Sequence, residues 1–181
     1  MGKVIIFQAS PRKKGTTAAL LAEVAAGAQS AGAEVVEYNL NDPGLRGCQS
    51  CMSCRREDAV ACVQKDYLNP MYADLKDASG VVLGTPIYMS TITAQAWILV
   101  DRLFPAMGPD FAPRFPGKKF GTVITQGAPD PVAYSANLAG VLGFLSSLGW
   151  ENAGNVTWAG AEGEPSDNLK TQAFELGKSL A

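Results

Sequence analysis

The chain has 181 residues, of which 47% are hydrophobic and 18% charged, and its formal net charge is −2. This length and apolar fraction suit one well-filled core and predict a single domain over residues 1–181. The near-neutral charge excludes the basic surface that a nucleic acid backbone would require. We find no apolar segment long enough for a membrane span or a secretory signal, so we expect a cytoplasmic protein without nucleic acid or membrane partners.

Strand and helix patterns alternate along the whole chain. Short apolar runs predict buried strands, and apolar residues at helical spacing predict helices. The predicted strands cover residues 3–7, 34–40, 80–86, 119–127 and 155–160. The predicted helices cover residues 16–31, 67–78, 93–104, 132–149 and about 166–180. This order predicts an α/β fold, a doubly wound five-stranded parallel sheet with helices on both faces.

Loops that follow parallel strands share one edge of the sheet, where such folds bind ligands. Four loops qualify, at residues 8–15, 41–66, 86–92 and 126–131. The chain contains no histidine. Any chemistry at this edge must therefore proceed without an imidazole base, nucleophile or metal ligand.

The first of these loops contains "SPRKKGTT" (10–17), with hydroxyls, a glycine and three cations before a helix. Backbone N–H groups at a helix N-terminus, with hydroxyls beside them, suit a phosphate. The segment lacks the lysine of a P-loop and the glycine pattern of a dinucleotide-binding turn. The alternative is a solvated turn with Thr16 as the N-cap.

The second loop contains all four cysteines of the chain, in "GCQSCMSCRREDAVAC" (47–62). They are Cys48, Cys51, Cys54 and Cys62. Three closely spaced cysteines with a distant fourth suit a [4Fe–4S] cluster, whereas zinc prefers two separated pairs. We favour the cluster, with reactive thiols or disulfides, zinc and inert thiols as alternatives. Three nearby arginines would offset cluster charge or form a solvated rim: Arg46, Arg55 and Arg56.

Three segments resemble the flavodoxin-fold NAD(P)H-dependent FMN reductases, and more closely their iron–sulfur flavoprotein branch. They are the first loop, the "TPIYMSTITAQAWILVDRL" block after the third strand and the cysteine loop between them. This resemblance implies a flavodoxin-like strand order 2-1-3-4-5, with a cysteine-rich insertion at about 41–66. It implies FMN phosphate contacts from Ser10, Arg12, Lys14, Thr16 and Thr17. It implies flavin contacts from Pro86, Ile87, Tyr88, Met89, Thr91, Thr125, Gln126, Gly127 and Ala128.

We therefore expect an FMN-dependent oxidoreductase or electron-transfer flavoprotein. Electrons would pass between a reduced donor, NAD(P)H or ferredoxin, and a small-molecule or protein acceptor, through FMN and a [4Fe–4S] cluster. No catalytic side chain is expected, because FMN takes the hydride itself. The alternative is a non-catalytic flavodoxin-like carrier or a zinc-stapled module that binds a phosphate ligand. Apolar residues around the flavin site and in segment 103–117 predict a homodimer or homotetramer.

Overall fold

The computed structural model describes residues 2–160 and 163–181. One twisted sheet contains the strands β1 (Lys3–Gln8), β2 (Glu34–Asn39), β3 (Gly80–Tyr88), β5 (Lys119–Gln126) and β6 (Glu151–Ala159), with the short β4 (Thr91–Ile92) beside β3. The strand order is β2-β1-β3-β5-β6, and every pair along it is parallel. This confirms the predicted order 2-1-3-4-5, in which β5 and β6 are the predicted fourth and fifth strands.

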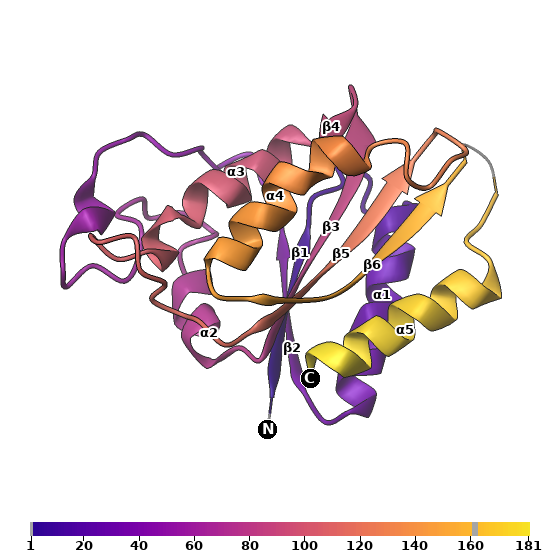
Figure 1. Ribbon diagram of the computed structural model, residues 1–181, viewed down its shortest axis with the longest axis horizontal. Coiled ribbons are helices and arrows are strands. Elements are labelled where there is room, and N and C mark those ends of the chain that lie inside the picture. The colour runs from indigo at the N-terminus through magenta and orange to yellow at the C-terminus, as the bar shows by residue number, and fades with distance from the viewer. Residues whose placement is uncertain (1, 161–162) are drawn as a thin grey trace.

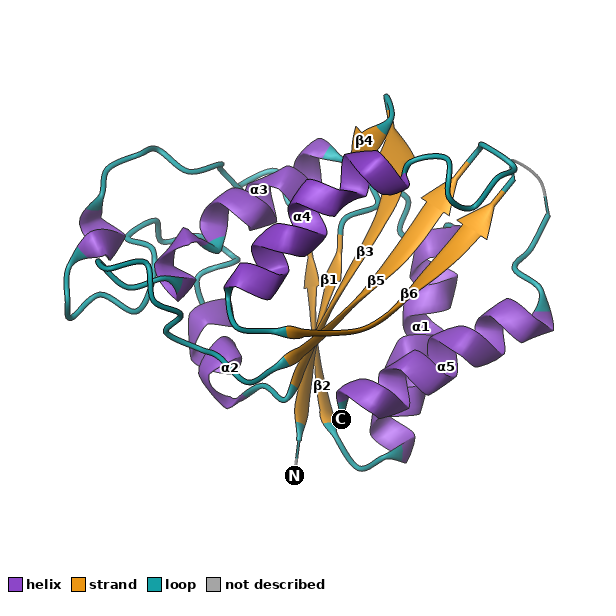
Figure 2. Cartoon of the chain, viewed as in Figure 1, coloured by secondary structure: helices purple, strands orange, loops and turns teal. Residues whose placement is uncertain are grey.

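Helices cover both faces of the sheet (Figures 1 and 2). They are α1 (Thr16–Ser30), α2 (Met71–Asp77), α3 (Ala94–Arg102), α4 (Ser135–Ser147) and α5 (Asp167–Leu180). Two short 3-10 turns, η1 (Ser53–Arg55) and η2 (Phe104–Ala106), lie in connecting segments. Among the described residues, no helix is long and apolar enough to cross a membrane.

The core divides into two layers because successive side chains of a strand point to opposite faces. In β1, Val4 and Ile6 pack with α1 and α5, whereas Ile5 and Phe7 pack with α2, α3 and α4. Helices α1 and α5 approach each other closely at Gly27, where a Cβ would lie 1.9 Å from the carbonyl oxygen of Phe174. A larger residue there would force these two helices apart.

The largest differences from the sequence prediction are two element boundaries and one added strand. Helix α2 begins at Met71, directly after Pro70, because a proline disfavours the helical conformation in the residue before it. Strand β6 begins at Glu151 rather than at residue 155, since this edge strand stays partly exposed and needs no continuous apolar run. Strand β4 was not predicted, and it forms a tight antiparallel hairpin with the end of β3.

Candidate functional site

A cleft lies at the carboxyl ends of β1, β3 and β5, where the sequence predicted a ligand. Ten residues predicted to contact FMN line it: Ser10, Arg12, Thr16, Thr17, Pro86, Ile87, Tyr88, Thr125, Gln126 and Gly127. Four other predicted residues belong to the same loops but are not part of this lining: Lys14, Met89, Thr91 and Ala128. Three residues that the sequence reasoning missed also line it: Gly15, Trp158 and Gly163.

The turn before α1 is held by its own hydrogen bonds. The amide of Ser10 donates to Gln8 Oε1 (2.8 Å), and the amide of Arg12 donates to Ser10 Oγ (3.2 Å). Gly15, not Thr16, is the N-cap of α1, and no side chain caps the helix there. The N–H groups of the first turn of α1 thus have no side-chain acceptor beside a cleft that contains Arg12. This arrangement fits an anionic phosphate.

A buried pair of hydroxyls joins α1 to β5 at the bottom of the cleft. Thr17 Oγ1 lies 2.8 Å from Thr125 Oγ1, and both residues are buried. One of the two hydroxyls donates to the other, and the accepting hydroxyl keeps its own O–H as a donor; both residues line the cleft. These side chains were predicted from separate loops, and the parallel sheet brings them together.

The hairpin between β3 and β4 borders the cleft. Met89 and Ser90 adopt positive φ angles of 48° and 67°, and the Met89 side chain is 94% exposed. Thr93 closes this region by donating to the carbonyl of Ala9 (3.0 Å) and capping α3 through the amide of Ala96 (3.2 Å). The hairpin thus carries Tyr88 at the edge of the cleft and leaves Met89 in solvent.

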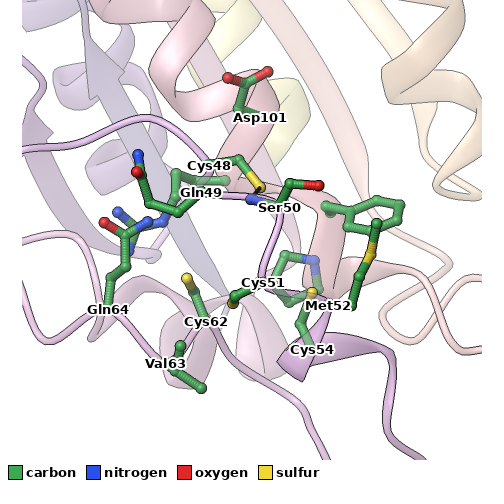
Figure 3. A pocket seen from close by; sticks show the side chains of 13 residues that line it. Cys48, Gln49, Ser50, Cys51, Met52, Cys54, Cys62, Val63, Gln64 and Asp101 are labelled. Carbon is green, nitrogen blue, oxygen red and sulfur yellow. Dashed lines mark hydrogen bonds between the residues drawn. The ribbon is translucent and has the colours of Figure 1, made fainter.

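A second, small pocket lies in the loop between β2 and α2, and all four cysteines line it (Figure 3). Cys48 and Cys51 are exposed, Cys54 and Cys62 are partly buried, and all four are free thiols. Non-glycine residues Ser50 and Met52 adopt positive φ angles in the turn that carries Cys51. Within residues 2–160 and 163–181, no three potential ligand side chains are close enough to hold a metal ion as placed.

The environment of the thiols differs along the loop. Hydrogen bonds from the backbone and the side chain of Ser53 lower the pKa of Cys51. Burial raises the pKa of Cys54, and the charges of the other three cysteines add to this effect. Negative charge on four converging thiolates is therefore unfavourable unless a cation compensates it.

Arg102, at the end of α3, fastens both ends of the cysteine loop. Its guanidinium binds the Asp66 carboxylate through two hydrogen bonds (2.6 and 3.1 Å) and donates to the carbonyl of Arg46 (3.0 Å). Burial lowers the pKa of Arg102, but the hydrogen bond with Asp66, the contact with Tyr72 and the nearby negative charge together raise it by more, so the guanidinium stays charged. Asn69 adds bonds to the carbonyls of Cys62 (2.9 Å) and Gln64 (3.0 Å).

The predicted charge-compensating arginines lie elsewhere. Arg55 stacks over the rings of Phe104 and Phe111, at 4.8 and 4.2 Å from their centroids, and Arg56 pairs with Asp58. None of Arg46, Arg55 and Arg56 lines the cysteine pocket, whereas Arg102 does. The sequence reasoning missed Arg102 because it ends an apolar helix, where a charged residue normally faces solvent.

The two pockets have no lining residue in common. In Figure 1 the cysteine loop extends beyond α2 and α3, away from the carboxyl ends of β5 and β6. The cysteines of one chain therefore do not lie at the edge of its own ligand cleft.

Comparison with known proteins identifies the family of this chain. A family model described as NADPH-dependent FMN reductase matches residues 2–148. An iron-sulfur flavoprotein of Archaeoglobus fulgidus is 26% identical over 99% of this chain and 79% of that protein. An iron-sulfur flavoprotein of Methanocaldococcus jannaschii is 33% identical over 57% of this chain, and the match spans 52% of that protein.

Solved structures show the same architecture. The NAD(P)H:quinone oxidoreductase from Methanothermobacter marburgensis has a TM-score of 0.71 over 99% of this chain and 96% of that chain, at 18% identity. This likeness shows the fold, and the family model covers every strand of the cleft except β6. The chain belongs to the NADPH-dependent FMN reductase family and is an FMN-dependent oxidoreductase.

Proposed function

We propose that this chain forms one domain over residues 1–181, with a cysteine-rich insertion at about 41–66, that carries both FMN and a [4Fe–4S] cluster. It would pass electrons from NAD(P)H or ferredoxin to a small-molecule or protein acceptor. The observation that carries this proposal is that all four cysteines line one pocket, separate from the FMN cleft. FMN would supply two-electron chemistry at N5, and the cluster would supply single-electron transfer.

The cleft residues suit each part of FMN. Arg12, the hydroxyls of Ser10, Thr16 and Thr17, and the uncapped N-terminus of α1 would bind the phosphate. Pro86, Ile87, Tyr88, Thr125, Gln126 and Gly127 would surround the flavin ring. Trp158, from β6, would exclude water from the opposite wall of the cleft, because it is a large and partly buried aromatic residue there.

Cys48, Cys51, Cys54 and Cys62 would bind the cluster. Iron would replace the thiol protons and relieve the repulsion among neighbouring thiolates. Because the cysteines are not within metal-binding range as placed, cluster insertion would draw the loop inward. The loop can change its conformation, because Cys48 and Cys51 are exposed and because the positive φ angles at Ser50 and Met52 store backbone strain.

Because the two pockets lie apart, we propose that electron transfer joins subunits of a homodimer or homotetramer. The cysteine loop of one copy would approach the FMN cleft of another. Large apolar side chains remain exposed for such a contact: Tyr88 at 43%, Met89 at 94% and Phe111 at 63%. Part of segment 103–117 also makes contacts within the chain, because the rings of Phe104 and Phe111 pack against the Arg55 guanidinium.

Anaerobic kinetics with the reconstituted protein test this function. Wild-type protein and Cys54→Ser are each reduced with NADPH, with NADH and with reduced ferredoxin, and electron delivery to a one-electron acceptor is followed. We expect the variant to keep FMN and two-electron reduction of the flavin, and to lose at least about 90% of the one-electron rate. Equal one-electron rates would contradict a role for the cluster, and no reduction by any donor would favour the carrier alternative.

A further inference from the structure

One nitrogen of the Arg102 guanidinium, Nε, has no hydrogen-bond acceptor. The two terminal nitrogens bind Asp66 and the carbonyl of Arg46, while Nε is buried and has no hydrogen-bond partner. The whole side chain is 1% exposed. Native structures seldom leave a buried charged donor unpaired, because the lost hydration is not recovered. Such a donor therefore indicates an acceptor that the protein binds.

The cysteine pocket is where such an acceptor can lie, because Arg102 lines it together with the four cysteines. Gln49 and Gln64 donate their amide N–H groups to the carbonyl of Gly47 (3.0 and 3.1 Å), so only their neutral amide oxygens could accept from Nε. Amides also cannot match the charge of the guanidinium. Asp101 also lines this pocket, but its carboxylate points away from the cysteines (Figure 3), so the anionic groups that remain for Nε are sulfurs.

We propose that Arg102 Nε donates a hydrogen bond to a sulfur of the [4Fe–4S] cluster, either a cysteinate or a sulfide. This inference rests on the proposed function, because it requires the cluster. Arg102 is then a positioning residue with two separate tasks. Its terminal nitrogens hold the two ends of the cysteine loop, and its Nε–H sets the electronic environment of the cluster.

An N–H donor and a fixed positive charge next to the sulfurs stabilise the reduced, more negative cluster. Hydrogen bonds to sulfur and net charge are two of the factors that set the potential of such clusters. Removal of the Nε–H should therefore lower the midpoint potential of the cluster. The charge alone does not replace it, so Arg102→Lys separates the hydrogen bond from the charge.

Arg114 offers a matched control. It binds the same loop through the carbonyls of Arg56 (2.8 Å) and Glu57 (3.1 Å), and it does not line the cysteine pocket. Arg114→Lys therefore perturbs loop attachment without touching the proposed bond. Asp66→Asn is a second comparison, since it removes the partner of the terminal nitrogens and leaves Nε in place.

The test is pulsed EPR on the reduced cluster of the full chain, labelled with ¹⁵N-arginine and reconstituted with iron, sulfide and FMN. We expect an arginine ¹⁵N coupling in the wild type and in Arg114→Lys, and none in Arg102→Lys, which should also show a lower midpoint potential. Should Arg102→Lys fail to fold, the wild type decides, because the absence of any arginine ¹⁵N coupling would overturn the inference. Asp66→Asn should keep the coupling, and its loss there would assign Arg102 a purely structural role.

The failure of this inference and the failure of the proposed function look different. If the wild type binds FMN but takes up no iron, the cluster proposal itself is wrong. If iron binds with a normal cluster spectrum, while Arg102→Lys keeps the coupling and the potential of the wild type, only the role of Nε is wrong. In that case the acceptor of Nε is a water molecule or a group outside the cluster.

Discussion

The FMN cleft and the cysteine loop are built in different ways. The cleft follows from the sheet, because the ends of β1, β3 and β5 bring short loops together and few side-chain bonds are needed. The cysteine loop has almost no regular structure and depends on the side chains of Arg102 and Asn69 for its attachment. A common fold thus supplies the cleft, and a few long-range contacts hold the loop that we propose as the cluster site.

The largest effect should come from Asp66→Ala. This change leaves the 1% exposed Arg102 guanidinium without its carboxylate, and a broken buried ion pair costs about 3–5 kcal/mol. Urea unfolding of the iron-free protein measures it. Asp58→Ala, which breaks the exposed pair with Arg56, should change the free energy of unfolding by less than about 1 kcal/mol. Equal losses in the two variants would show that the loop attachment contributes little.

Loss of the phosphate ligand in the cleft should have an intermediate effect. Arg12→Ala removes one charge-assisted hydrogen bond, worth about 1.5 kcal/mol or about tenfold in FMN affinity at this exposed position. Titration of the apoprotein measures it. The neighbouring Lys13→Ala is the control, since Lys13 does not line the cleft. Riboflavin, which lacks the phosphate, should bind both variants as it binds the wild type, and an equal loss for both flavins would refute the assignment.

The smallest effect concerns α2, which follows the cysteine loop. Burial raises the pKa of Asp74, but hydrogen bonds from Lys3 and Tyr38 outweigh it and lower the pKa below its ordinary value. Asp74 therefore stabilises the fold above the carboxyl pKa of the unfolded chain, about 3.9, and this stabilisation is lost as the pH falls through the lower folded value. In Asp74→Asn the free energy of unfolding should fall less steeply than in the wild type as the pH drops from about 5 to about 2. An identical pH profile would remove Asp74 from the acid response.

Much of the fold and of the FMN cleft could be predicted, because apolar strands and hydroxyl-rich turns are local patterns. Strand β4 could not, since its turn uses Met89 and Ser90 at positive φ angles instead of the usual glycine. Trp158 was missed because only the pairing of β6 with β5 brings it to the cleft. Arg102 depends on contacts with residues far away in the chain, which no local pattern indicates.

The most direct test of the account is the iron, sulfide and FMN content of one anaerobically reconstituted sample. We predict about four irons and four sulfides per chain together with one FMN, with flavin absorbance and a broad shoulder near 400 nm. In Cys62→Ser the iron and the shoulder should be lost while FMN remains, because the cysteine pocket and the FMN cleft share no residue. Stoichiometric FMN without iron in the wild type would contradict the account, and the cysteines would then act as redox thiols.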